Sequence, residues 1–83
     1  MLSFTPEGWQ DYTSHTDRRL VKRINQLIDD IMRNGYDGIG KPEPLRGDLS
    51  GWWSRRIDSE HRLVYRLKGD DVQIAACRFH YWK

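Results

Sequence analysis

An apolar stripe between residues 20 and 31 constrains the fold of this chain more than any other feature. Four apolar residues follow one another at spacings of four, three and four, the pattern of a helix with one buried face: Leu20, Ile24, Leu27 and Ile31. We predict this helix over residues 16–34, ended by Gly35. The charged side chains are expected on its solvent face: Arg18, Arg19, Lys22, Arg23, Asp29 and Asp30. Because the apolar face must be buried, the rest of the chain has to supply a packing partner.

The N-terminal residues predict a shorter helix in front of this one. Thr5 suits the N-cap, Pro6 the first helical position and Glu7 the first turn, so the helix should run to about Thr13. Residues 2–4 are short enough for an edge strand. Two helices in series favour an αα-hairpin.

The second half of the chain is predicted to form the sheet on which the helices pack. Short turns at 58–60 and 68–71 separate three predicted strands and favour an antiparallel meander: residues 53–57, 61–67 and 72–81. Alternation in the middle strand places Leu63 and Tyr65 on the covered face and Arg62 on the open face. The expected fold class is therefore α+β, an antiparallel sheet with two N-terminal helices packed on one face, formed by residues 1–83 as a single domain.

Charge is distributed unevenly along the sequence. Residues 1–40 carry five Lys/Arg and six Asp/Glu, a net −1, whereas residues 41–83 carry nine and six, a net +3. A basic half favours an anionic ligand such as RNA or DNA, although a solvated charged surface is the commoner explanation for charge alone. A single cysteine excludes an internal disulfide, and no segment predicts a membrane span or a signal peptide. A cytoplasmic location away from the membrane is therefore expected.

Residues 35–51 hold five of the seven glycines and two of the three prolines, which predicts a long loop. A loop of this length inside a small domain usually serves the function. Glu43 stands in it between Pro42 and Pro44, whose rings restrict the backbone and fix the direction of the carboxylate. The alternative is an ordinary solvated loop carboxylate.

The residues after this loop suit an RNA phosphate and base. With a three-residue turn at 58–60, Arg56 should lie opposite Arg62 on the open face, and Arg55 should point to the other face. Two facing like charges destabilise a sheet unless an anion lies between them. The adjacent tryptophans Trp52 and Trp53 could both be core residues, and one in the core with the other as a stacking platform is equally compatible with the sequence. In the second case we assign the platform to Trp52.

These residue types match the cleavage of RNA without a metal. A base removes the proton of a ribose 2′-OH, cations stabilise the charge that develops on the phosphate, and an acid protonates the leaving 5′-oxygen. Glu43, the arginines and His80 match these roles in type, although a lone histidine is more commonly an ordinary surface residue. The spacing of His and Cys predicts no metal site, and no cofactor is expected.

Four segments, in order, resemble the YoeB/Txe toxins of the RelE superfamily. They are Gly-Lys-Pro-Glu-Pro-Leu (40–45), Leu-Ser-Gly-Trp-Trp-Ser-Arg-Arg-Ile (49–57), Glu-His-Arg-Leu-Val-Tyr (60–65) and Ile-Ala-Ala-Cys-Arg-Phe-His-Tyr (74–81). The likeness also includes the helix with Lys22-Arg23-Ile24-Asn25. This family belongs to bacterial type II toxin–antitoxin systems, so the resemblance implies a compact toxin that enters the A site of the 70S ribosome and cuts mRNA there without a metal.

The resemblance also implies a role for each matching residue. Glu43 would be the general base, His80 the general acid and Arg62 the group that stabilises the scissile phosphate, while Tyr81 would orient the substrate or the reacting groups. Two further basic residues would help to hold the RNA: Arg46 and Arg56. The chain departs from the family pattern after its His-Tyr pair, where family chains commonly stop and where Trp82 and Lys83 follow here.

The partners implied by the resemblance are a cognate antitoxin similar to YefM, the ribosome with its mRNA, and a second copy in a homodimer. Operon DNA would be bound only by the toxin–antitoxin complex. An alternative of a different class is a non-catalytic RNA-binding or regulatory module on the same fold, which would act through its antitoxin.

Overall fold

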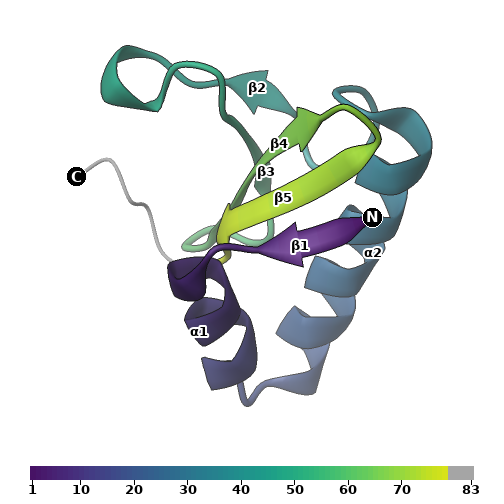
Figure 1. Cartoon of the computed structure of the whole chain (residues 1–83). Coiled ribbons are helices and arrows are strands. Elements are labelled where there is room, and N and C mark those ends of the chain that lie inside the picture. The colour runs from purple at the N-terminus through teal and green to yellow at the C-terminus, as the bar shows by residue number, and fades with distance from the viewer. Residues whose placement is uncertain (79–83) are drawn as a thin grey trace.

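The computed structural model of this chain describes residues 1–78. Its elements, in chain order, are β1 (Leu2–Phe4), α1 (Pro6–Ser14), α2 (Arg18–Asn34), β2 (Glu43–Pro44), the 3-10 turn η1 (Gly47–Leu49), β3 (Trp53–Arg56), β4 (Arg62–Lys68) and β5 (Asp71–Ala76). Figure 1 shows α2 running along one side of the sheet, while the loop that carries η1 projects away from this helix. The α+β fold class is confirmed.

The five strands form one sheet in the order β1-β5-β4-β3-β2. The pairs β2–β3, β3–β4 and β4–β5 are antiparallel, as the short turns predict for the last two. In contrast, β1 pairs with β5 in parallel, with Leu2 opposite Val72. The prediction of an antiparallel sheet is therefore wrong for this edge strand. Two helices, and not a tight turn, separate β1 from the other strands, so nothing in its connection enforces an antiparallel direction.

The helix boundaries follow their capping residues. The Thr5 side chain accepts a hydrogen bond from Gly8 N at the start of α1, and the Asp17 side chain accepts one from Arg19 N at the start of α2. The second helix thus begins two residues later than predicted, because Asp17 and not Thr16 supplies the cap. It ends as predicted, with Gly35 N donating to Ile31 O at 2.8 Å.

The core lies between the helices and the sheet. Leu27 and Ile31 of α2 are buried in the same cluster as Leu63 and Tyr65 of β4, and Tyr12 of α1 packs against it. Both helices therefore cover one face, and the predicted alternation in β4 is confirmed. The backbone of α1 approaches β5 so closely that a side chain at Gly8 would clash with the carbonyl oxygen of Ile74. None of the helices within residues 1–78 is long and apolar enough to span a membrane.

Two predicted boundaries change. Strand β5 ends at Ala76, whereas the sequence predicted a strand to Tyr81, whose last residues lie outside the described part of the chain. The loop predicted over 35–51 contains a two-residue strand, β2, which adds Glu43 and Pro44 to the edge of the sheet. The residue between the prolines thus pairs with β3 at the edge of the sheet.

Candidate active site

Two arginines face each other on the open face of the sheet. Arg56 of β3 and Arg62 of β4 are register partners, as the turn length predicted. Their neighbours in register, Arg55 and Leu63, are buried on the helix side, so Arg56 and Arg62 point away from the helices. Arg56 is exposed, whereas the Arg62 side chain is only 13% exposed.

Glu43 lies beside this arginine pair. Its Oε1 is 3.6 Å from Nη1 of Arg62, and its side chain stays 58% exposed. Register explains the contact: Glu43 pairs with Ser54, which pairs with Val64, two residues along β4 from Arg62. A carboxylate open to solvent and a largely buried guanidinium therefore meet at one point, where a ribose hydroxyl and its adjacent phosphate can be held together.

The two tryptophans have different surroundings, which favours the second of the two alternatives. Trp53 packs against the core and stacks on Tyr36, with ring centroids 4.4 Å apart. Trp52 lies on the other side, where the Arg66 guanidinium sits 4.5 Å from its ring centroid. One face of this predicted stacking platform is therefore already covered by an arginine. Arg46 is exposed and immediately precedes η1, in the projecting loop.

His80 and Tyr81, predicted as acid and orienting residue, lie outside the described residues. The chain that leads to them is held by α1 and the residue after it. At Cys77, which follows β5, the backbone N donates to Asp11 Oδ2 at 3.2 Å and the carbonyl oxygen accepts from His15 Nε2 at 2.7 Å. Sequence reasoning gave neither residue a role, because neither pairing follows from spacing along the chain.

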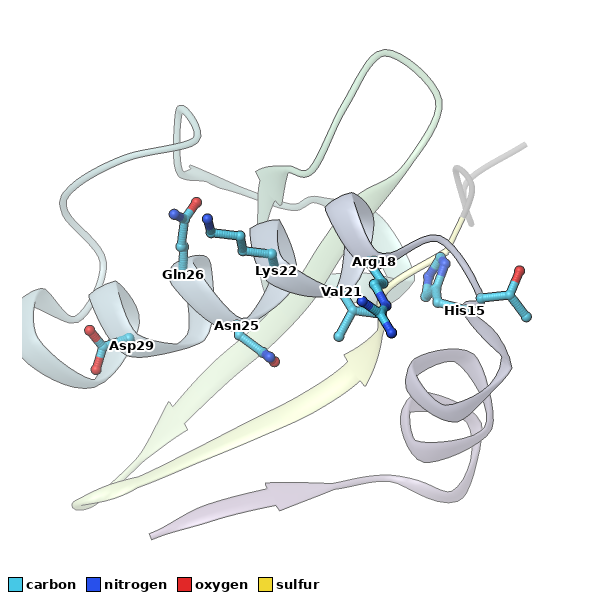
Figure 2. Close-up of a pocket in the computed structure, with 8 residues that line it drawn as sticks. His15, Arg18, Val21, Lys22, Asn25, Gln26 and Asp29 are labelled. Carbon is cyan, nitrogen blue, oxygen red and sulfur yellow. The ribbon is translucent and has the colours of Figure 1, made fainter.

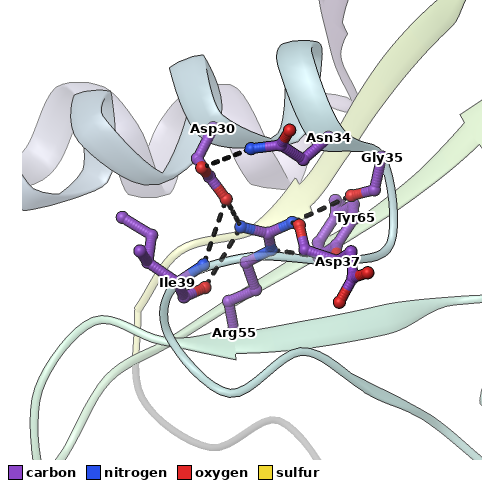
Figure 3. Close-up of polar contacts among 7 residues, drawn as sticks. All are labelled: Asp30, Asn34, Gly35, Asp37, Ile39, Arg55 and Tyr65. Carbon is purple, nitrogen blue, oxygen red and sulfur yellow. Dashed lines mark hydrogen bonds and ion pairs between the residues drawn. The ribbon is translucent and has the colours of Figure 1, made fainter.

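The sequence predicted the face to which Arg55 points but gave this residue no role. It is fully buried, and its guanidinium donates to the Asp30 carboxylate, the Tyr65 hydroxyl and three backbone carbonyls of the α2–β2 loop (Figure 3). The placement of Asp30 on the solvent face of α2 was wrong, since its side chain is only 18% exposed. The hydrogen bond from Arg55 lowers the pKa of the Asp30 carboxyl below its ordinary value of 3.8.

A signal for this pair was present in the sequence. Strand alternation already directed Arg55 to the covered face, where a buried guanidinium requires an anion. Asp30 is three residues from Leu27 and adjacent to Ile31, at the border of the apolar stripe. It was the acidic residue of α2 best placed to supply that anion.

A hollow in the described surface lies away from the arginine pair. It measures about 590 Å³ and is lined by α2 and the connection before it, with Lys22, Asn25 and Gln26 around it (Figure 2). None of the predicted site residues lines it. Among residues 1–78, no three His, Cys, Asp or Glu side chains gather closely enough to hold a metal ion.

Comparison with known proteins matches this chain over nearly its full length. The family model for the YoeB-like toxin of bacterial type II toxin–antitoxin systems matches residues 4–81. Toxin YoeB of Streptomyces coelicolor and Toxin YoeB of Escherichia coli K12 are each 55% identical over 82 residues, covering 96% of this chain and 98% of the relative.

Solved structures agree with this match. The YoeB/ParE toxin from Agrobacterium tumefaciens superposes with a TM-score of 0.91 at 49% identity, covering 96% of this chain and 98% of the other. The YoeB–YefM complex from Staphylococcus aureus gives 0.90 at 44% identity, covering 98% and 97%, and the YoeB dimer from the same organism gives 0.87 at 46%, covering 96% and 95%. Sequence, fold and family model point the same way, and the chain belongs to the YoeB-like toxins of bacterial type II toxin–antitoxin systems.

Proposed function

We propose that this chain is a ribosome-dependent endoribonuclease that cuts mRNA in the A site by attack of a ribose 2′-OH. The observation that carries the proposal is the meeting of Glu43 and Arg62, 3.6 Å apart, on the face where Arg56 lies opposite Arg62. This arrangement supplies a carboxylate base and two cations at one point of the surface. Membership of the YoeB-like toxins supports the same reaction.

In the proposed mechanism, Glu43 accepts the proton of the 2′-OH, and the freed oxygen attacks the adjacent phosphorus. Arg62 and Arg56 stabilise the negative charge that grows on the phosphoryl oxygens, an interaction that is strongest in the transition state. His80 protonates the leaving 5′-oxygen, and Tyr81 orients the reacting groups. Because the 2′-oxygen forms the new bond, the upstream fragment ends in a 2′,3′-cyclic or a 3′-phosphate.

The RNA is proposed to run along the loop that follows Glu43. Arg46, which is exposed before η1, contacts a phosphate, and Trp52 offers a base the ring face that Arg66 leaves open. These contacts hold the strand without reading its sequence, since phosphates and ring faces are common to all nucleotides.

The partners are proposed from the relatives. A YefM-like antitoxin binds and neutralises the chain, as in the solved Staphylococcus aureus YoeB–YefM complex, and homodimers form as in the YoeB dimer of that organism. The net +3 of residues 41–83 favours an acidic antitoxin segment across the open face. Operon DNA is bound only by the joint complex.

The test is cleavage of a defined mRNA on programmed 70S ribosomes by the purified protein, mapped by primer extension. We expect a cut within the A-site codon and an upstream fragment with a cyclic or 3′-phosphate end, in EDTA that is titrated to leave free Mg²⁺ sufficient for the ribosome. A 3′-hydroxyl end would contradict the 2′-OH mechanism. A block to primer extension from ribosome-bound but intact mRNA would favour the non-catalytic RNA-binding module.

A further inference from the structure

We propose that Arg55 is a positioning residue for Glu43, acting from the covered face of the sheet through the loop between α2 and β2. The inference rests on the proposed function, in which Glu43 is the base. Arg55 itself cannot reach the substrate, because its side chain is fully buried. It acts by fixing the backbone that delivers Glu43 to Arg62.

The guanidinium of Arg55 binds several backbone carbonyl oxygens of the loop between α2 and β2. Nη2 donates to the carbonyl oxygens of Gly35 and Asp37 at 2.8 and 2.7 Å, and Nη1 donates to that of Ile39 at 3.1 Å. Every second residue of the loop from 35 to 39 is thus bound by one side chain, as Figure 3 shows. Nε donates to the Tyr65 hydroxyl at 3.1 Å, which ties the same group to β4.

Asp30 of α2 binds both Arg55 and the loop. Its carboxylate accepts from Arg55 Nη1, from the backbone N of Ile39 at 3.1 Å and from Asn34 Nδ2 at 2.8 Å. The buried cation is therefore neutralised by a group that also binds the loop. Ile39 is held at both its N–H and its carbonyl oxygen, by Asp30 and Arg55 respectively.

The loop is held equally tightly where it reaches the sheet. Arg56 N donates to Gly40 O at 2.7 Å, and a Cβ on Gly40 would lie 2.8 Å from Leu27 Cδ2 and 3.2 Å from Arg55 Cβ. The next residue, Lys41, has a φ of 51°. A positive φ is unfavourable for any residue other than glycine, and Lys41 keeps this backbone conformation only because its surroundings enforce it. Glu43 follows two residues later.

The strand that carries Glu43 is too short to fix it alone. β2 has two residues, paired with Ser54 and Trp53, and it is followed by a backbone hydrogen bond from Leu45 N to Trp52 O at 2.9 Å. The contact between Glu43 and Arg62 therefore depends on where the preceding loop places the start of β2. Arg55 and Asp30 set that place.

The test compares Arg55→Lys with the wild type in single-turnover mRNA cleavage on programmed ribosomes. Lysine keeps the cation beside Asp30 but cannot reproduce the planar fork that serves five acceptors. We expect the rate per folded molecule to fall by about tenfold or more, because small displacements of a catalytic group are costly in rate. Hydrogen exchange should accelerate at the amides of residues 39 and 56, while residues 62–76 keep their protection.

A double-mutant cycle separates positioning from general destabilisation. If Arg55 acts through Glu43, then Arg55→Lys should slow the wild type but leave the residual rate of Glu43→Gln unchanged within about twofold. A purely structural role would lower both rates alike. Ile24→Val is the matched control, because it perturbs the core about 9 Å along α2 from Asp30 and should leave the rate per folded molecule unchanged.

A second pair of variants covers the case in which Arg55→Lys does not fold. Gly40→Ala pushes the loop away from β3 without altering Arg55 and should give the same fall in rate. Gly69→Ala is its control, since Gly69 has a comparable φ of 61° in the β4–β5 turn but no atom within 4 Å of an added Cβ. A wild-type cleavage rate for Gly40→Ala, or for a folded Arg55→Lys, overturns this inference but leaves the proposed function standing. Wild-type cleavage by Glu43→Gln removes the proposed function and the inference with it.

Discussion

Arg56 and Arg62 stand directly opposite each other on β3 and β4, and the Glu43 carboxylate lies 3.6 Å from the Arg62 guanidinium. Facing like charges disfavour the folded sheet, and a bound anion relieves that repulsion. The carboxylate approaches Arg62, while Arg56 stays exposed. An RNA phosphate is expected to complete the arrangement.

Arg56→Ala should weaken the binding of short single-stranded RNA to the same extent for every base sequence. It should also lower the slope of log affinity against log salt by about one, since one phosphate contact is lost. Fluorescence anisotropy between 50 and 200 mM salt gives both quantities. Arg33→Ala is the control, because Arg33 lies on α2 in an exposed pair with Asp29. A slope equal to that of the wild type would remove Arg56 from the RNA site.

Glu43→Gln and His80→Ala should each slow mRNA cleavage on ribosomes by about 10²–10⁴-fold while the protein stays folded. Arg62→Lys should also be impaired, because an ammonium cannot present the planar fork of donors. Single-turnover rates and thermal melts of the same preparations measure the two effects. Wild-type rates for both Glu43→Gln and His80→Ala would show that the assigned acid and base are wrong.

Leu63→Ala should lower the free energy of unfolding by about 2–5 kcal/mol, because Leu63 is fully buried beneath α2 and its truncation leaves a cavity. Urea unfolding measures this loss. Met32→Ala is the matched control, because Met32 is a large apolar residue on α2 that is 53% exposed, and it should change stability by less than about 0.5 kcal/mol. Equal effects of the two substitutions would contradict the described core.

Asp30 makes stability depend on pH in the acid range. Arg55 lowers the pKa of this carboxyl in the folded state, so its contribution to stability is complete above the unfolded pKa, near 3.8, and is lost as the pH falls through the lower folded value. The urea midpoint should therefore drop from about pH 5 downward. Asp30→Asn should be less stable at pH 7 and flatter in this window. Asp29→Asn, one residue away on the exposed face, should follow the wild type.

Cys77 should be inert toward thiol reagents in the native protein. Burial raises the pKa of its thiol to about 12, so almost no reactive thiolate exists at neutral pH, and the side chain is inaccessible. Labelling by a chromogenic disulfide should proceed only at the rate at which the protein opens, and should become immediate in denaturing urea. Rapid stoichiometric labelling of folded protein would show that the end of β5 is not packed as described.

Local patterns predicted the parts of the fold that depend on near neighbours in sequence. The stripe on α2, the alternation in β4 and the turn between β3 and β4 gave the buried face and the pairing of Arg56 with Arg62, because periodicity and turn length determine these directly. The Glu43–Arg62 contact also depends on the short strand β2, and a strand is not predicted for a segment with two prolines.

Features that depend on contacts between distant segments could not be predicted from the sequence. The parallel direction of β1 is set by the return of β5 to its side, about seventy residues later. The burial of Asp30 is set by a guanidinium on β3 that enters from the opposite layer. His80 and Tyr81 keep the roles implied by resemblance as predictions, since they lie outside the described residues.

The parallel pairing of β1 with β5 has a consequence for folding during synthesis. Leu2 cannot find Val72, nor can Val72 N donate to Met1 O at 2.8 Å, until the chain has been synthesised to its last strand. The N-terminal strand therefore has no partner strand until β5 has been synthesised and has left the exit tunnel. A copy that stops before residue 71 lacks β5, and with it the strand that joins β1 to the rest of the sheet.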